Sequence, residues 1–248
     1  MMSYIKYLSG LLITLCLLQG CKQNMPETPV IDYGYEYYPL EVGFWHVYNV
    51  DEIIWDDFHN TIDTLHYQIK DSIESVLSVS AKDTIYRIEY FKRMNDNDPW
   101  QMQGSKSIIK SQKKLLLNDE NLIYCKMAFP LSASSHWNEY NAIDSALFYQ
   151  THYATTNIIN NNVKNTDAFI AHYKTDINLN DKTFHDCITV NLHQFASLIN
   201  ADSEQEVYAP YIGLISQKII HTESKAKNGV FYIYNGFIRE ISLSDYKQ

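Results

Sequence analysis

Side chains able to act as nucleophiles or general bases are spread along the chain without the spacing of an established catalytic motif. His185-Asp186-Cys187 sets a base beside a thiol, and an adjacent imidazole can activate a thiolate nucleophile. Successive strand residues point to opposite faces, so His185 and Cys187 would share a face that Asp186 does not. A buried structural thiol beside a surface histidine is therefore the favoured interpretation.

Other local motifs are missing from the sequence. It contains no His-x-x-x-His, Cys-x-x-Cys, Gly-x-Ser-x-Gly or glycine-rich phosphate loop. Asp51, Glu52, Asp56 and Asp57 could supply an acid and base pair or calcium ligands, but such adjacency is more typical of a solvated loop. The sequence predicts a protein that is not an enzyme, without catalytic residues, a cofactor or a metal site.

The first 21 residues have the pattern of an export signal. Lys6 precedes the apolar run Leu8 to Leu18, and Gly20-Cys21 follows it. About a dozen apolar residues are too few for a spanning helix, which needs roughly 20. The segment resembles a bacterial lipoprotein signal with its lipobox. That resemblance implies that residues 1–20 are removed and that Cys21 carries diacylglycerol and an amide-linked chain such as palmitate, giving a membrane anchor.

Composition then divides the mature chain. Residues 21–36 are expected to form the lipidated N-terminus and a tether, because the stretch after Cys21 is polar and holds Pro26 and Pro29. Residues 37–248 suffice for one mainly β domain.

Charge and cysteine content limit the partners. The chain has 20 Lys and Arg against 29 Asp and Glu, so the mature form carries about −10 and offers no basic groove for nucleic acid. The membrane, through the covalent lipid, is the expected partner. Cys125 and Cys187 remain in the body; they could form a disulfide in an oxidising compartment or remain as two buried thiols.

Alternating patterns predict a mainly β fold with few short helices. Leu65 to Ile69 and Thr84 to Phe91 alternate apolar and polar side chains, as half-buried strands do. Asn228-Gly229 and Asn235-Gly236 separate apolar runs and predict tight turns, hence a three-stranded antiparallel meander from Gly213 to Leu243. Two stretches, Ala142 to Thr155 and Leu192 to Glu206, could be helical.

Three aromatic and proline motifs carry a family resemblance. Tyr38-Pro39-Leu40-x-x-Gly43-x-Trp45, Phe129-Pro130-Leu131 with Trp137, and Tyr208-Ala209-Pro210-x-x-Gly213-Leu214-Ile215 make the chain similar to uncharacterised lipoproteins of Bacteroidetes-type bacteria. Ser135 stands where the second motif more usually has glycine. The resemblance implies an outer-membrane lipoprotein, on the periplasmic face or the cell surface. It also implies a curved antiparallel sheet, a half-barrel or sandwich similar to periplasmic lipoprotein carriers.

Bacteria of this kind attach glycans to Ser or Thr after Asp and before a small or apolar residue. Four such triplets occur, and the hydroxyl residues predicted to carry O-glycans are Thr64, Ser72, Thr84 and Ser145.

Three functions remain open from the sequence. The first is a non-enzymatic cell-envelope lipoprotein whose aromatic-rich sheet binds an apolar or glycan ligand; it predicts an apolar pocket lined by Tyr and Trp. The alternative is a structural lipoprotein that interacts with an envelope protein. A hydrolase acting on envelope polymers is less favoured.

Overall fold

Antiparallel strands make up nearly all of the regular structure. The computed structural model describes residues 31–119, 122–139 and 167–248, and among them the only helix is the 3-10 turn η1 (Tyr35–Tyr37). The strands are β1 (Trp45–Asp56), β2 (Thr61–Val79), β3 (Asp83–Arg93), β4 (Gln101–Ser111), β5 (Lys114–Asp119), β6 (Leu122–Ala128), β7 (His136–Asn138), β8 (Asp167–Leu179), β9 (Lys182–Ala196), β10 (Asn200–Ala209), β11 (Gly213–Lys227) and β12 (Val230–Lys247).

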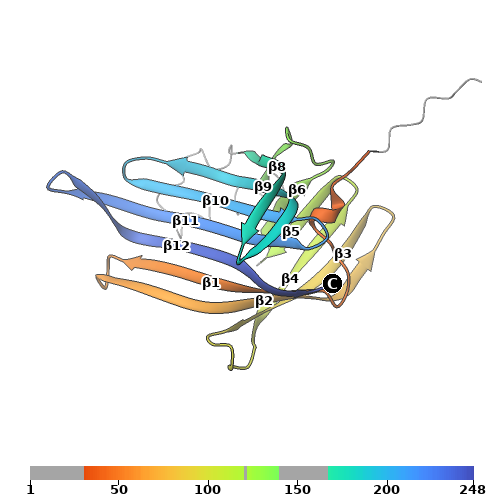
Figure 1. The fold of residues 1–248 in the computed structure, drawn as a ribbon, viewed down its shortest axis with the longest axis horizontal. Helices are drawn as coiled ribbons and strands as arrows, with labels where there is room; N and C mark the ends of the chain where they lie inside the picture. Colours follow the sequence, from red (N-terminus) through yellow and green to blue (C-terminus); the bar gives the residue numbers. More distant parts are fainter. Residues whose placement is uncertain (1–30, 120–121, 140–166) are drawn as a thin grey trace, which may run out of the picture. The chain divides into compact units, whose positions relative to one another are not determined.

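All twelve strands belong to one sheet. Its order is β6-β5-β4-β3-β2-β1-β12-β11-β10-β9-β8-β7, so neighbours along the chain are neighbours in space, and β1 pairs with β12 at the centre (Figure 1). The two edges are β6 and β7, which follow one another in the sequence. The sheet is therefore a meander whose first and last strands pair.

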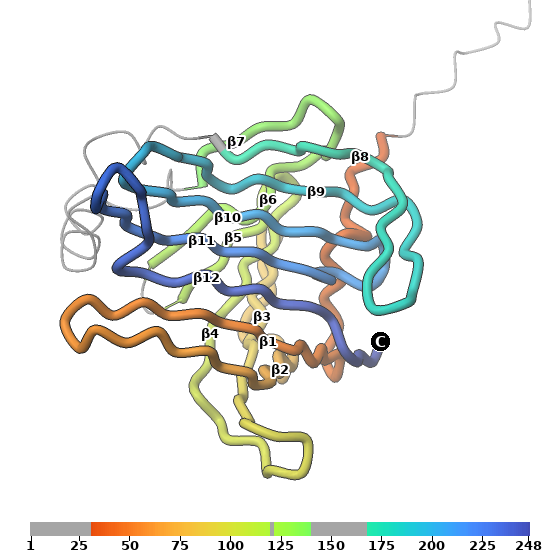
Figure 2. Tube along the Cα trace, turned by 60° about the vertical axis from the view of Figure 1, so that its left-hand side comes forward, coloured from red at the N-terminus to blue at the C-terminus, as the bar shows by residue number. Residues whose placement is uncertain are grey.

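The sheet curls until its edges meet. Figure 2 shows β8 to β12 with β1 and β2 as one wall, and β3 to β6 behind them running across their direction. The Trp137 indole on β7 donates a hydrogen bond to the Cys125 carbonyl oxygen on β6, at 2.9 Å. The predicted curved antiparallel sheet is confirmed, as a single nearly closed sheet rather than a sandwich.

The segment that contains η1 fills one part of the interior. Tyr37 and Leu40 lie in the larger apolar cluster, which takes side chains from β2 to β10, and Tyr33 and Tyr35 pack against it. The Tyr37 hydroxyl donates to the Asp186 carbonyl oxygen at 2.7 Å. Residues from 32 onward thus belong to the same compact unit as the sheet. A second apolar cluster joins β1, β11 and β12 to the β8–β9 hairpin.

Strand predictions from alternation are confirmed. The strands predicted at Leu65 to Ile69 and Thr84 to Phe91 lie within β2 and β3. The helix considered at Leu192 to Glu206 is wrong: β9 runs to Ala196 and β10 starts at Asn200, because their backbones pair in register. The other helical stretch, Ala142 to Thr155, lies outside the described residues. No helix of the described part of the chain is long and apolar enough to cross a membrane.

The predicted three-stranded meander is half correct. Asn228-Gly229 does form the turn of the β11–β12 hairpin, with positive φ at both residues. Asn235-Gly236 instead lies inside β12, where the pairing with β11 shifts between Glu223 and Ser224. Gly236 has φ +110°, and a Cβ there would overlap the His221 carbonyl oxygen. Tyr234 is the extra residue of this β-bulge, and the nearby Gly236 pairs with Thr222 in a backbone conformation that only glycine fits.

Candidate functional site

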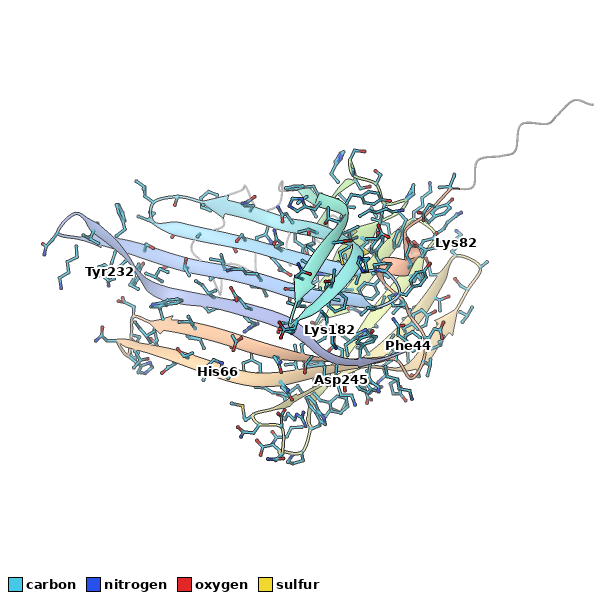
Figure 3. All side chains as sticks on the ribbon, viewed as in Figure 1. Phe44, His66, Lys82, Lys182, Tyr232 and Asp245 are labelled. Atoms are coloured by element: carbon cyan, nitrogen blue, oxygen red, sulfur yellow. The ribbon has the colours of Figure 1, made fainter. Side chains whose placement is uncertain are left out.

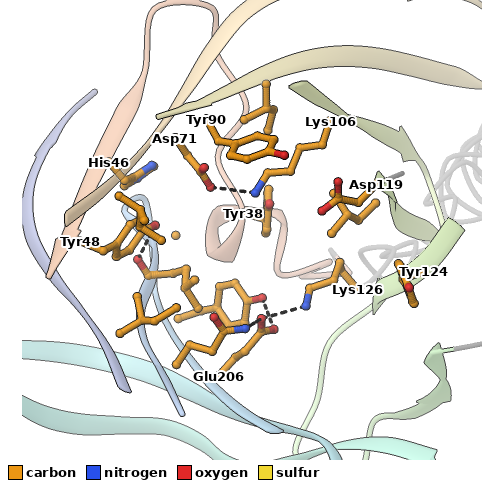
Figure 4. A pocket seen from close by; sticks show the side chains of 18 of the residues that line it. Tyr38, His46, Tyr48, Asp71, Tyr90, Lys106, Asp119, Tyr124, Lys126 and Glu206 are labelled. Carbon is orange, nitrogen blue, oxygen red and sulfur yellow. Dashed lines mark hydrogen bonds and ion pairs between the residues drawn. The ribbon is translucent and has the colours of Figure 1, made fainter. Parts of the chain in front are cut away.

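The curled sheet encloses a cavity of about 520 Å³. Its wall combines aromatic rings, aliphatic side chains and ionisable groups from many strands, as Figure 4 shows from close by. The tyrosines are Tyr38, Tyr48, Tyr90, Tyr124 and Tyr208, and the charged residues are Asp71, Lys106, Asp119, Lys126, Glu139, Glu204, Glu206 and Arg239. The predicted pocket therefore exists and is tyrosine-lined, but no tryptophan lines it and it is far from purely apolar.

One side of the cavity holds a balanced ion pair. Lys106 on β4 donates to Asp71 on β2 at 3.1 Å, and its ammonium lies 5.7 Å from the centre of the Tyr90 ring. Burial alone would lower the pKa of Lys106, but the Asp71 carboxylate outweighs it and raises that pKa. Burial raises the pKa of Tyr38 to about 12, so this phenol stays a neutral donor.

The opposite side holds a network around Glu206 of β10. Its Oε1 accepts hydrogen bonds from Lys126 at 2.8 Å and Gln217 at 3.0 Å, and its Oε2 accepts one from the Tyr208 hydroxyl at 2.6 Å. Gln217 also donates to Glu204 at 2.7 Å, while Lys126 lies 4.0 Å from Glu204. Glu206 is thus fully engaged, and one lysine faces two carboxylates of the same strand.

Glu139, just after β7, adds a third carboxylate. It is only 5 % exposed, and its Oε2 has no hydrogen-bond partner among the described residues. Burial raises the pKa of Glu139 to about 7, against the opposing effect of Lys126. The cavity wall thus contains a buried carboxylate oxygen that no described donor reaches.

Histidines take supporting places around the site. His46 on β1 lines the cavity and bonds through Nε2 to the Ile212 carbonyl oxygen at 2.7 Å; burial lowers its pKa, so it stays neutral. Outside the lining, Asp202 lies 3.2 Å from His193 and 3.5 Å from His221. Burial would raise the pKa of Asp202, but the two imidazoles lower it well below its usual range.

The structure resolves the question of the cysteines. Cys125 and Cys187 are both free and buried, and they belong to different apolar clusters. The disulfide considered from the sequence is therefore not formed, and the alternative of two buried thiols holds. Burial raises the pKa of each thiol to about 11, which leaves both protonated at neutral pH.

The favoured interpretation of His185-Asp186-Cys187, a buried thiol beside a surface histidine, is confirmed, but the expected shared face of His185 and Cys187 is wrong. His185 is 73 % exposed and pairs with Asp176 at 3.1 Å, whereas Cys187 is fully buried. Asp186 has φ +53°, and the pairing between β8 and β9 is irregular here. This bulge breaks strict alternation, so the imidazole and the thiol do not share an environment.

The acidic residues singled out between positions 51 and 57 do not form one site. Glu52 is buried against Arg239, Asp51 pairs with His66, Asp56 pairs with His59, and Asp57 pairs with Lys225. Among the residues that the structure describes, no group of three His, Cys, Asp or Glu could hold a metal ion.

Modification sites predicted from the sequence lie on strands or outside the described part. Thr64 is exposed on β2, Ser72 is half-buried on the same strand, and Thr84 is half-buried on β3. Cys21 and Ser145 lie outside the described residues.

Sequence reasoning missed the cavity carboxylates although a signal was present. Glu204, Glu206 and Tyr208 are spaced by two, so in a strand they share one face. Treating Leu192 to Glu206 as a helix concealed that pattern.

Comparisons with known proteins give a likeness of fold only. No family model and no curated protein matches the sequence. Among solved structures, a "putative lipoprotein" from Parabacteroides distasonis is 12% identical, with a TM-score of 0.42, over 85% of this chain and 98% of that one. A Bacteroides fragilis protein with a YmcC-like fold is 10% identical, with the same TM-score and coverage. A LolA superfamily protein from Nitrosomonas europaea is 11% identical, with a TM-score of 0.18, over 86% of this chain and 89% of that one.

Proposed function

We propose that this protein is a non-enzymatic lipoprotein of the cell envelope that binds a hydroxyl-rich ligand of the glycan class in its cavity. The observation that carries the proposal is the wall itself, in which five tyrosines and eight Asp, Glu, Lys and Arg residues stand among aliphatic side chains. Tyrosine rings offer flat faces to a sugar ring, while carboxylates accept and lysines donate hydrogen bonds to hydroxyls. An acyl chain here would desolvate charged groups without replacing their partners, which disfavours the apolar ligand.

Binding can be tested with a matched pair of tyrosines. Full-length protein purified in detergent would be screened on a glycan array, and hits measured by calorimetry. Tyr208→Phe removes a hydroxyl that contacts Glu206 in the cavity, whereas Tyr234→Phe removes a like contact to Glu223, at 2.8 Å, away from it. We expect Tyr208→Phe to weaken binding about tenfold and Tyr234→Phe to leave it unchanged. Absence of any glycan hit, or equal affinities of the two variants, would contradict the proposal.

The anchor is the second part of the proposal. Lys6, the apolar run and Gly20-Cys21 support lipidation at Cys21 and attachment to the outer membrane. Cys21→Ser should abolish labelling by radioactive palmitate and move the protein out of the membrane fraction. Cys16→Ser, in the removed segment, is the matched control and should keep both properties. Continued palmitate labelling of Cys21→Ser would refute the assignment.

Glycosylation at Thr64, Ser72, Thr84 and Ser145 remains part of the proposal. The exposed side chain of Thr64 supports access by a glycosyltransferase. Native protein should show an intact mass above that of the polypeptide plus lipid, and Thr64→Ala should reduce the excess. A native mass that equals polypeptide plus lipid would exclude all four sites.

A second candidate function is a protein interaction at the hairpin tips. Phe58 at the β1–β2 turn is 91 % exposed, and Leu198 at the β9–β10 turn is 75 % exposed. Tyr232 lies near the β11–β12 turn, where Figure 3 labels it, with Val230 also exposed beside it. Exposed apolar groups of this kind favour contact with another envelope protein. Chemical cross-linking in intact cells should then depend on Leu198 and not on the cavity.

One observation supports the alternative that the protein is a hydrolase. The carboxylates Glu139 and Glu206 both line the cavity, and the raised pKa of Glu139 would suit a general acid. If the cavity is catalytic, prolonged incubation with envelope polysaccharide should release reducing ends, and Glu139→Gln should stop that release. A purely binding cavity gives none with either protein.

A further inference from the structure

The acidic side of the cavity has more negative than positive charge. Lys126 lies 2.8 Å from Glu206 and 4.0 Å from Glu204, Glu139 lines the same cavity, and the other donors to Glu204 and Glu206, Gln217 and Tyr208, are neutral. On the opposite side, Lys106 pairs with Asp71, and Asp119 also lines the cavity. The larger group of carboxylates is therefore the one on the Lys126 side of the wall.

Glu139 indicates where a ligand group would complete this network. The Oε2 atom is buried, and it accepts no hydrogen bond from the described residues, although Glu139 lines the cavity. A buried acceptor without a donor is costly, and more so when it is ionised. Lys126 is already engaged by Glu206 at 2.8 Å, and none of the described residues donates to Glu139 Oε2, so a donor group of a bound ligand would complete the network.

The chemistry of the wall narrows the donor to an organic cation. These carboxylates form no metal-ligand set among the described residues. Tyr208 contacts Glu206, its ring centre lies 6.0 Å from that of Tyr38, and tyrosine faces attract cations. An ammonium group supplies three donors and one positive charge. The cavity of about 520 Å³ leaves room for the ring that carries it.

We propose that the cavity binds a ligand bearing a primary ammonium group, which donates to Glu139 beside Glu204 and Glu206. This inference rests on the proposed glycan function and specifies it: the sugar carries a free amine. The sugar hydroxyls would then face the balanced Lys106 and Asp71 pair.

Three sugars that differ at one substituent test the proposal. Glucosamine, N-acetylglucosamine and glucose would be titrated calorimetrically into detergent-purified full-length protein at pH 7.5. We expect glucosamine to bind about tenfold or more tightly than the other two, because a charge-assisted hydrogen bond is gained. Glu139→Gln should remove this preference. Glu41→Gln, which removes an equal charge from an exposed position, should keep it.

A non-sugar probe separates the two proposals. 1,5-Diaminopentane carries ammonium groups on a chain without hydroxyls, and 1,5-pentanediol is its neutral match. Equal affinities of the three sugars would overturn the ammonium site and leave the glycan function standing. Binding of the diamine, but of neither the sugars nor the diol, would uphold the ammonium site and overturn the glycan function. Failure of every probe to bind would overturn both.

Discussion

Replacing Glu139 by glutamine should stabilise the protein in a way that grows with pH. The folded state holds the pKa of this carboxyl group at about 7, raised from 4.5 by burial. Above pH 4.5 the unfolded chain loses this proton while the folded chain keeps it, so the wild-type free energy of unfolding falls as pH rises towards 7. The penalty is complete above pH 7, and glutamine, which has no proton to lose, is free of it.

The magnitude follows from the size of the pKa shift. A shift of about 2.5 units corresponds to about 3 kcal/mol once both states are ionised, and to about 1 kcal/mol at pH 5. The gap in free energy of unfolding between Glu139→Gln and wild type should therefore widen by about 2 kcal/mol from pH 5 to pH 8.

Urea unfolding of the detergent-purified proteins, followed by circular dichroism at several pH values, measures the gap. Glu41→Gln is the control, because its exposed carboxyl should give a curve parallel to wild type. If the Glu139→Gln and wild-type curves are also parallel between pH 5 and 8, Glu139 does not titrate as a buried group. A gap that narrows with rising pH would reverse the sign and refute the desolvation argument.

Two further predictions concern the backbone and the thiols. Gly236→Ala should lower the free energy of unfolding by at least about 2 kcal/mol, because a Cβ there overlaps a carbonyl oxygen of β11. Gly229→Ala has open space at its turn and should lower it by about 1 kcal/mol, from its positive φ alone. Equal losses in the two variants would argue against the close packing of β11 at Gly236. Cys125 and Cys187 should resist a thiol reagent in the folded protein, because burial keeps both thiols protonated, and should react stoichiometrically in urea. Rapid reaction of these thiols in the folded protein, or the absence of free thiol in urea, would contradict the structure.

Local alternation was sufficient to predict individual strands. The half-buried pattern of Leu65 to Ile69 lies in β2 because one face of that strand meets the interior of the sheet. The preference of Asn-Gly for tight turns was a less reliable predictor, since both Asn-Gly pairs have this preference and only one forms a turn. Asn228-Gly229 turns the chain, whereas Gly236 pairs with Thr222 of β11 and Trp55 of β1, so pairing on both sides keeps the second Asn-Gly pair within β12, next to a bulge at Tyr234.

The candidate site depends on contacts that no local pattern contains. Spacing by two places Glu204, Glu206 and Tyr208 on one face of β10, and this much was available from the sequence. Lys126, however, is 80 positions from Glu206 and belongs to the strand at the far edge of the same sheet. Their 2.8 Å contact exists only because the sheet curls until its edges approach. The charge on this side of the cavity is thus a property of sheet closure, and a ligand that binds to these carboxylates would contact strands from both edges of the sheet.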